Sequence, residues 1–304
     1  MVRLLRMVAW FLLTAIAASA QDRPAALAQR LGYPANVRLL IIQADVGMMH
    51  SIDRAAFEAL EKHWITSATI LVPCPWFPEV VQFAHTHPEV DFGIHLALNS
   101  EWATYRWGPV SPHALVPSLL DADGYFPPLE TDVVRQAKPG EVEQELRAQI
   151  EKARAAGIRV THLDSHMGTL FTSPQLLEVY RKLGREYQLP ILLPRSLPHA
   201  TEMGVGERDF SLDRELQMRP GVPPEQWLEE YKKMLRTLPP GVYQLTVHLG
   251  YDDQEARGAT GDRNWGGAWR QRDLEVIGSP EFQEFLHAER FVLIGWKELA
   301  PAVR

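Results

Sequence analysis

The sequence predicts an α/β fold in which parallel strands alternate with helices and close, or nearly close, into a barrel. Apolar, β-prone runs alternate with amphipathic helical patterns along the whole 304-residue chain, which is typical of a parallel sheet. Several runs are continuously apolar, as expected of strands that are covered on both faces. About seven such units in this length suit a barrel better than an open sheet. The predicted strands are 38–42, 67–72, 91–98, 159–163, 191–193, 242–247 and 291–294.

The amino end, which precedes the first strand, has the pattern of a secretory signal peptide. Arg3 and Arg6 precede an apolar stretch over residues 7–17, and Ala18-Ser19-Ala20 forms a small-x-small exit. The apolar stretch is shorter than the roughly 20 residues of a membrane span; an uncleaved membrane anchor is the alternative. We therefore expect residues 1–20 to be removed and residues 21–304 to form a single domain. This domain would be periplasmic or secreted, without stable membrane insertion.

The amino-acid composition argues against several classes of binding partner and of metal site. The content of 46% apolar and 23% charged residues is that of an ordinary globular protein. A formal charge of −7 without an extended basic patch argues against a nucleic acid or an anionic membrane as partner. The single cysteine, Cys74, excludes an intrachain disulfide and a multi-cysteine zinc site. The core must therefore hold the fold, and a homodimer is compatible with the sequence.

Three helices are predicted between the strands. The first runs over 54–63, with Ser51 or Asp53 as its cap. The second, over 141–156, places its apolar residues on one stripe and ends at a glycine. The third opens at Ser173-Pro174 and is expected to end before Gly184.

Two long insertions, 99–139 and 255–278, interrupt the strand–helix pattern. Long loops without periodicity are often lids or binding loops. Trp102 in the first insertion is a candidate surface on which a sugar ring stacks, with simple packing of the loop as the alternative. Arg195, after the strand 191–193, is a candidate contact for a substrate oxygen or a salt-bridge partner. Glu145 lies off the apolar stripe of its helix and is expected to be solvated.

Polar residues capable of chemistry lie at the ends of four predicted strands. The carboxyl ends of barrel strands meet on one face, so these residues are expected to converge. One Asp and two His leave the open positions that a catalytic divalent metal requires, and a further His can act as general acid. The residues concerned are Asp45, His95, Asp164, His166 and His248.

The segments around these residues resemble the YdjC/ChbG-type carbohydrate deacetylases. The resemblance runs in order from about residue 37 to residue 299 and includes Trp269-Arg270-Gln271-Arg272-Asp273. Its most specific motif is His162-Leu163-Asp164-Ser165-His166. The other matching segments are 39–45 with 47–51, 92–98 and 247–253.

The resemblance implies a deformed seven-stranded (β/α) barrel of the glycoside hydrolase/deacetylase type that removes N-acetyl groups from an acetylated amino sugar. It further implies one divalent metal ion, Mg²⁺ or Zn²⁺, bound by Asp45, His95 and His166. By the same resemblance His248 is the general acid. His162 and Asp164 support the metal ligand His166.

The chain departs from the family pattern at the end of its first strand. The family has two adjacent aspartates there, one as catalytic base and one as metal ligand, whereas this chain has Asp45 alone. Matching from residue 39 forward makes Asp45 the base, and matching backward from Gly47 makes it the metal ligand, which we favour slightly.

The missing aspartate leaves a second hypothesis open: a sugar- or metal-binding protein with weakened catalysis on the same barrel. A glycoside hydrolase using Asp45 and Asp164 ranks last, because the histidines would have no task. The signal peptide also argues against a phosphorylated, cytoplasmic substrate.

Overall fold

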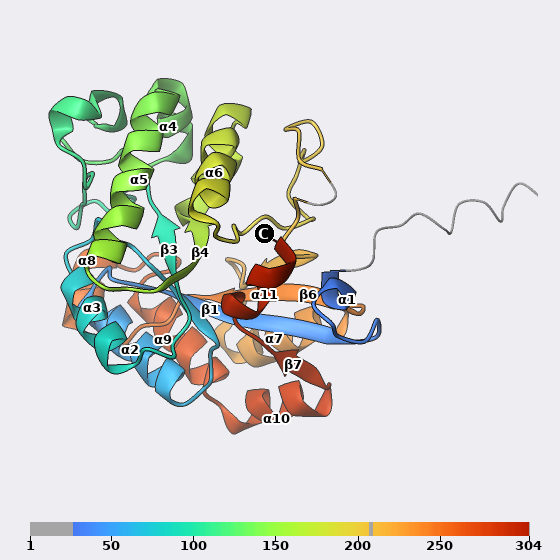
Figure 1. Ribbon diagram of the computed structural model, residues 1–304. Helices are drawn as coiled ribbons and strands as arrows, with labels where there is room; N and C mark the ends of the chain where they lie inside the picture. The colour runs from blue at the N-terminus through green and yellow to red at the C-terminus, as the bar shows by residue number, and fades with distance from the viewer. Residues whose placement is uncertain (1–26, 207–208, 304) are drawn as a thin grey trace, which may run out of the picture.

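A parallel sheet that closes into a deformed barrel forms the centre of the computed structural model, which describes residues 27–206 and 209–303 (Figure 1). The predicted signal peptide lies outside the described residues. Within them the strand order is β4-β3-β2-β1-β6-β5, and β7 pairs with β1. The strands are β1 (Arg38–Val46), β2 (Ser67–Ile70), β3 (Phe92–Leu96), β4 (Val160–Ser165), β5 (Arg214–Gln217), β6 (Gly241–Val247) and β7 (Phe291–Leu293).

The barrel closes between β4 and β5 through isolated bridges. Leu163 of β4 bridges Ile191, and Pro194 bridges Leu212, which leads into β5. The strand predicted over 191–193 is therefore reduced to a bridge, and β5 was not predicted at all. Its sequence, Arg-Glu-Leu-Gln, has one buried residue, so it lacks the apolar run by which the other strands are recognised. The predicted deformed seven-stranded barrel is confirmed.

Strand β1 is buried on both faces, and its alternation sets the direction of the functional side chains. Leu40 and Ile42 pack in the large core beneath the helices. Leu39 and Ile41 pack instead with Trp296 in the second core, inside the barrel. Because side chains alternate along a strand, Asp45 points to the same interior side as Leu39 and Ile41.

Helices surround the sheet (Figure 1), and none of those described is long and apolar enough to cross a membrane. They are α1 (Leu27–Arg30), α2 (His50–Glu61), α3 (Phe77–Thr86), α4 (Glu130–Gln136), α5 (Pro139–Ala155), α6 (Pro174–Tyr187), α7 (Trp227–Arg236), α8 (Gln254–Thr260), α9 (Gly267–Ile277), α10 (Pro280–Ala288) and α11 (Trp296–Val303).

The helices predicted near 141–156 and after Ser173 are present as α5 and α6, and Ser173 caps α6 by accepting from the Leu176 amide. Gly184 does not end α6. The helix continues to Tyr187, and Gln188 ends it with φ 56°. A Cβ on Gly184 would lie 2.5 Å from the Ile191 side chain, so this glycine lets the helix pack closely on the barrel.

The start of α2 also differs from the prediction. The helix begins at His50, so Ser51 and Asp53 lie inside its first turn and do not cap it. The Asp53 carboxylate accepts from the Gly47 amide at 2.6 Å. It therefore closes the turn between β1 and α2, directly after Asp45.

Glu145 on α5 is fully buried, so its predicted solvation is wrong. Its carboxylate accepts from the amides of Val110 at 2.9 Å and Ser111 at 2.8 Å. The polar side of α5 at this position faces the first insertion instead of water. Glu145 thereby fixes the insertion 99–139 against the barrel.

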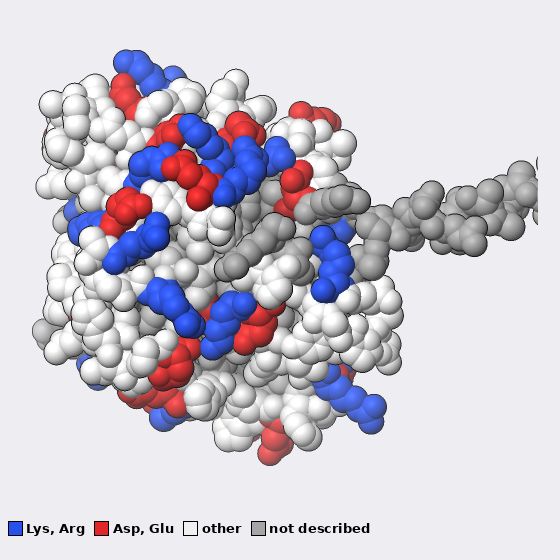
Figure 2. Space-filling model, viewed as in Figure 1, with Lys and Arg blue, Asp and Glu red and all other residues white. Residues whose placement is uncertain are grey.

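Charged side chains of both signs are interspersed on the face shown in Figure 2. On α5 and α6, Glu143 pairs with Arg147 at 3.0 Å and with Lys182 at 2.7 Å. This face offers no continuous basic surface to a polyanion.

Candidate active site

A cavity of about 860 Å³ opens at the carboxyl ends of the strands. It gathers residues from β1, β3, β4, β5 and β6 and from both insertions, and it includes all five polar residues that the sequence predicted to converge. Its functional lining comprises Gln43, Asp45, His95, Glu101, Trp102, Asp164, His166, Glu215, His248, Trp265 and Arg270.

Asp45, at the end of β1, is paired with Arg270 of α9. The guanidinium Nη1 lies 3.1 Å from Asp45 Oδ1, and Nη2 lies 3.3 Å from Oδ2. Arg270 is itself held by a hydrogen bond from Nε to the Trp265 carbonyl at 2.8 Å. Burial alone would raise the pKa of Asp45, but Arg270 and then His248 hold it well below its usual range. Asp45 is therefore a carboxylate near neutral pH.

His95, on β3, is oriented by Asp164 of β4. Its Nδ1 lies 3.4 Å from Asp164 Oδ2, an ion-pair distance, but makes no hydrogen bond among the described residues. Burial lowers the pKa of His95, but the carboxylates of Asp164, Asp45 and Glu215 together raise it more, so the pKa lies above its usual value. Gln43 Nε2 donates to the same Asp164 oxygen at 2.8 Å.

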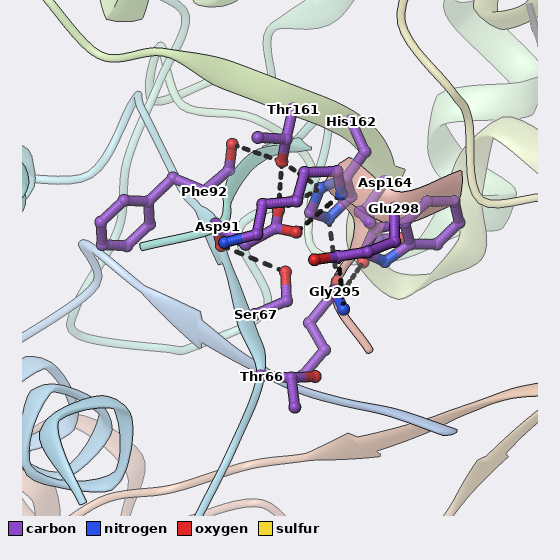
Figure 3. A network of polar contacts seen from close by, with 12 residues as sticks. Thr66, Ser67, Asp91, Phe92, Thr161, His162, Asp164, Gly295 and Glu298 are labelled. Atoms are coloured by element: carbon purple, nitrogen blue, oxygen red, sulfur yellow. Dashed lines mark hydrogen bonds and ion pairs between the residues drawn. The ribbon is translucent and has the colours of Figure 1, made fainter. Parts of the chain in front are cut away.

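His162 extends this chain of contacts toward the other end of the barrel. Its Nε2 donates to Gln43 Oε1 at 2.9 Å, and its ring stacks on Trp296. Figure 3 shows the far side of the network, where Thr161, Asp91 and His162 meet. A Cβ on Gly93 would lie 2.4 Å from the His162 ring, so only glycine fits there.

The supporting role predicted for His162 and Asp164 therefore needs a correction. Both were expected to support His166, the last residue of their motif. In the structure Asp164 meets His95 of β3, and His162 is bonded to Gln43 of β1. Asp164 therefore orients His95, and His162 supports Asp164 through Gln43.

His166 follows β4 and is paired with Glu101 of the first insertion. Its Nε2 lies 3.0 Å from Glu101 Oε2. Its ring stands at 75° to that of His95, with 5.1 Å between the ring centroids. Burial raises the pKa of Glu101, but His166, the Glu101 backbone amide and Arg270 together lower it more, so the pKa lies below its usual value.

His248, just after β6, is held through its backbone. Its amide donates to Asp273 Oδ2 at 3.0 Å, while Asp273 Oδ1 accepts from Trp227 and Tyr231. Burial lowers the pKa of His248 to about 4, although Asp45 opposes the shift. In the free chain His248 is therefore a neutral imidazole at the edge of the cavity.

Glu215, on β5, brings an unexpected carboxyl group to the cavity. Thr246 donates to its Oε1 at 2.8 Å. Burial, reinforced by the nearby Asp164 carboxylate, raises the pKa of Glu215 to about 7.

The two predicted substrate contacts differ in their position. Trp102 lines the cavity, and its ring also packs against Tyr105 and Trp107 of the same insertion. Both the sugar-stacking and the loop-packing alternatives are therefore compatible with its position. Arg195 instead pairs with Asp213 at 3.4 Å and lies over the Phe210 ring. It is not part of the cavity lining, and the salt-bridge alternative describes its position.

The predicted metal ligands share the cavity without forming a closed ligand group. Among the described residues, no three His, Cys, Asp or Glu side chains are close enough together to hold a metal ion as they stand. Asp45 is turned toward Arg270. The adjacent His95 and His166 rings nonetheless provide the donor types of a divalent transition metal, and because Nδ1 of His95 faces Asp164, its Nε2 is the atom left for a cation.

Three ionisable residues of this functional lining had no assigned role in the sequence analysis. Glu101 stands beside Trp102 in an insertion, Glu215 lies in a strand that was not predicted, and Arg270 lies on a helix within the second insertion. The only available signal was the inclusion of Arg270 in the family-like segment 269–273.

The fold and the cavity together define an α/β-barrel hydrolase. The chain belongs to the YdjC-like family, whose model matches residues 39–288. A carbohydrate deacetylase from Thermus thermophilus is 32% identical over 286 residues, spanning 91% of this chain and 99% of that protein. A carbohydrate deacetylase from Brevibacillus brevis is 27% identical, spanning 86% of this chain and all of that protein.

A solved structure from Enterococcus faecalis V583 has the same fold. It superposes with a TM-score of 0.74 at 26% identity and covers 87% of this chain and 99% of that chain. Its name links that protein to cellobiose-phosphate cleavage. The predicted family and barrel are thus confirmed.

Proposed function

We propose that the protein is a carbohydrate deacetylase that hydrolyses the N-acetyl group of an acetylated amino sugar. The observation that carries the proposal is the convergence of Asp45, His95, His166 and His248 on one cavity, although they span about 200 residues of sequence. The names of the relatives support the reaction class.

Amide hydrolysis needs one proton removed from the attacking water and one delivered to the leaving amine. Asp45 is our candidate for the first task by its position on the cavity, and Arg270 keeps it charged. Its low pKa makes it a weak base, so the attacking water must itself be made more acidic. His248 suits the second task by its position on the same cavity. Its pKa of about 4 means that it must receive its proton within the substrate complex. A general base or acid is typically worth about 10²–10⁴-fold in rate.

A divalent metal, Zn²⁺ or Mg²⁺, is proposed to bind through His95 and His166. When bound, it would polarise the acetyl carbonyl and lower the pKa of a water molecule to about 7. The protein's part is to orient the ligands. Asp164 sets the His95 ring, and Gln43 with His162 holds Asp164 in place.

The cavity suits an uncharged sugar that becomes an amine. Its lining has more carboxyl groups than guanidinium groups, and this excess disfavours a phosphorylated substrate. The carboxyl groups are those of Asp45, Glu101, Glu130, Asp164, Glu215 and Asp262, against Arg263 and Arg270. Trp102 and Trp265 offer aromatic surface to a sugar ring at the cavity wall. Export to the periplasm or medium, which the signal-like amino end suggests, is consistent with a polymeric or oligomeric substrate.

The alternative proposal is a sugar- or metal-binding protein with weakened catalysis. It is motivated by the residues that flank Asp45, since Ala44 and Val46 carry no second carboxylate. Both pack in the large apolar core, and of the two only Ala44 also touches the cavity. Ala44→Asp is therefore the variant with which to restore a second carboxylate.

The test measures acetate released from N-acetylated chito-oligosaccharides by purified residues 21–304, with and without added Zn²⁺ or Mg²⁺. We expect metal-dependent release that His166→Ala and Asp45→Asn each lower at least 100-fold, while His287→Ala on the exposed side of α10 has no effect. Metal binding without acetate release from any chain length would favour the binding protein. Gain of activity by Ala44→Asp would then identify the missing carboxylate as the cause.

A further inference from the structure

We propose that Glu101, rather than Asp45, is the carboxylate that binds the divalent metal beside His95 and His166. The inference rests on the proposed function and assigns a ligand within the same cavity. It follows from a comparison of the partners of the two carboxylates: Asp45 is bound by an arginine, whereas Glu101 faces a histidine.

Asp45 is committed to a different partner. Both of its oxygens lie within 3.4 Å of the Arg270 guanidinium. Arg270 is only 3% exposed and cannot swing into solvent, because Nε is bonded to the Trp265 carbonyl and a Cβ on Gly250 would already touch its stem. A cation bound to Asp45 would therefore sit against a fixed positive charge.

Glu101 has the opposite environment. Its Oε2 meets His166 Nε2 at 3.0 Å, and its side chain is 23% exposed toward the cavity. Within the described chain Glu101 makes no hydrogen bond or ion pair with an arginine or lysine, and the charge of Arg270 reaches it only through space. A carboxylate and an imidazole that face each other at this distance can both turn their lone pairs to one cation.

The chain leading to Glu101 is rigid enough to place a ligand. Ser100 is fully buried, and its Oγ accepts from the Trp107 amide at 3.0 Å. The Ser100 amide donates to the Pro127 carbonyl at 3.1 Å. Asn99, also fully buried, is bonded to Thr169 just after His166. The insertion and the His166 segment are thus tied together on both sides of the Glu101–His166 contact.

His95 completes the donor set. Its ring adjoins that of His166, and its Nδ1 faces Asp164 at 3.4 Å, which leaves Nε2 as the atom for the cation. Asp164 behind the ring is at ion-pair distance, the arrangement by which carboxylates orient metal-binding histidines. Binding requires Glu101 to exchange its contact with His166 for the cation, since the three side chains do not form a ligand group as they stand.

The experiment titrates metal-free residues 21–304 with Zn²⁺ against a chromogenic chelator. Glu101→Gln is compared with Asp45→Asn and with Glu130→Gln, a matched acidic residue on the same cavity. We expect Glu101→Gln to weaken Zn²⁺ binding at least tenfold and the other two variants to change it less than threefold. Thermal melting of each metal-free variant separates a lost ligand from a lost fold.

Loading with Co²⁺ gives a readout that is independent of both affinity and activity. The visible absorption of Co²⁺ reports its ligands, so Glu101→Gln should change the spectrum, whereas Asp45→Asn should leave it unchanged. Loss of Zn²⁺ by Asp45→Asn with retention by Glu101→Gln would overturn the inference. So would an equal loss in all three variants, which would show an effect of net charge alone.

Acetate release distinguishes failure of the inference from failure of the proposed function. If the wild-type protein releases acetate and Glu101→Gln binds Zn²⁺ as tightly as the wild type, the proposed function stands and only the assignment of Glu101 as a ligand is overturned. Wild-type protein that binds neither Zn²⁺ nor Mg²⁺ overturns the inference and the metal site together.

Discussion

Each chemically important side chain in the cavity is held by a partner from another element. Asp45 has Arg270, His95 has Asp164, and His166 has Glu101. Such partners fix the orientation and the charge of a group before substrate arrives, which is what a preorganised site requires. The sequence predicted the histidines of the site, whereas their partners are known only from the structure.

Arg270→Met should destabilise the protein strongly, because it leaves Asp45 as a buried charge without a partner. Removing one member of a buried pair typically costs about 3–5 kcal/mol. Urea unfolding of the metal-free protein measures the loss. The double variant Arg270→Met/Asp45→Asn should recover most of it, because no charge then remains unpaired; a double variant as unstable as the single one would contradict this account.

Glu215→Gln should change how stability depends on pH. The folded-state pKa of Glu215 is raised to about 7 from 4.5, so the wild-type protein loses stability as pH rises through this window, where the unfolded state ionises first. The glutamine variant has no such loss. As the pH rises from 4.5 to about 7, the free energy of unfolding of the variant should therefore increase relative to that of the wild type by roughly 3 kcal/mol at most, since one pKa unit is about 1.4 kcal/mol.

Urea unfolding of chelator-treated protein at several pH values checks this expectation. Thr246, which donates to Glu215, can still donate to the amide oxygen of the variant. A stability difference that is constant with pH would show that Glu215 ionises normally.

At the scale of elements, the apolar runs of the buried strands predicted the barrel, and the strand ends predicted the location of the site. The exceptions have two physical causes: a short strand of mostly polar, partly exposed residues has no apolar run, and polar residues that are buried against distant parts of the chain carry no periodic signal. β5 is mostly polar. Glu145 and Arg270 lie on helices, and their partners are far away in the sequence. The partners of a buried charge become visible only when the tertiary structure is known.

Glu145→Gln should loosen the first insertion. The two carboxylate oxygens of Glu145 accept from two backbone amides, and the variant keeps only one acceptor oxygen. Hydrogen bonds to a charged group contribute about 1.5–3 kcal/mol each, so we expect a loss of that order in the free energy of unfolding. Faster proteolysis within 99–139 should accompany it.

Glu151→Gln on the same helix is the matched control, because its side chain is 55% exposed. Surface substitutions of this kind usually change stability by less than about 0.5 kcal/mol. Equal effects of the two variants would mean that the Glu145 contacts do not hold the insertion.

At the scale of the whole molecule, the end of the chain fills the end of the barrel opposite the site. Trp296 at the start of α11 is fully buried with Leu39 and Ile41 of β1. Its ring stacks on His162, and its Nε1 donates to Gln244 at 2.9 Å. The same indole thus joins the apolar core to the polar network that leads through Gln43 to Asp164.

Trp296→Ala should cost about 3–5 kcal/mol, as expected for a large side chain deleted from a core. Trp296→Phe should cost less, because it keeps the stacking on His162 and loses mainly the hydrogen bond to Gln244. Thermal or urea unfolding of the two variants measures the difference. Equal costs would assign the stabilisation to the hydrogen bond rather than to packing.

The pairing of β7 with β1 also has a consequence for the order in which the protein is assembled. β1 needs neighbours from near both ends of the sequence, since it pairs with β2, β6 and β7. Contacts that span nearly the whole chain form late and slowly. During synthesis, the first strand therefore emerges long before its last partner exists. The growing chain must keep this most apolar segment from aggregating until residues 291–303 have been made.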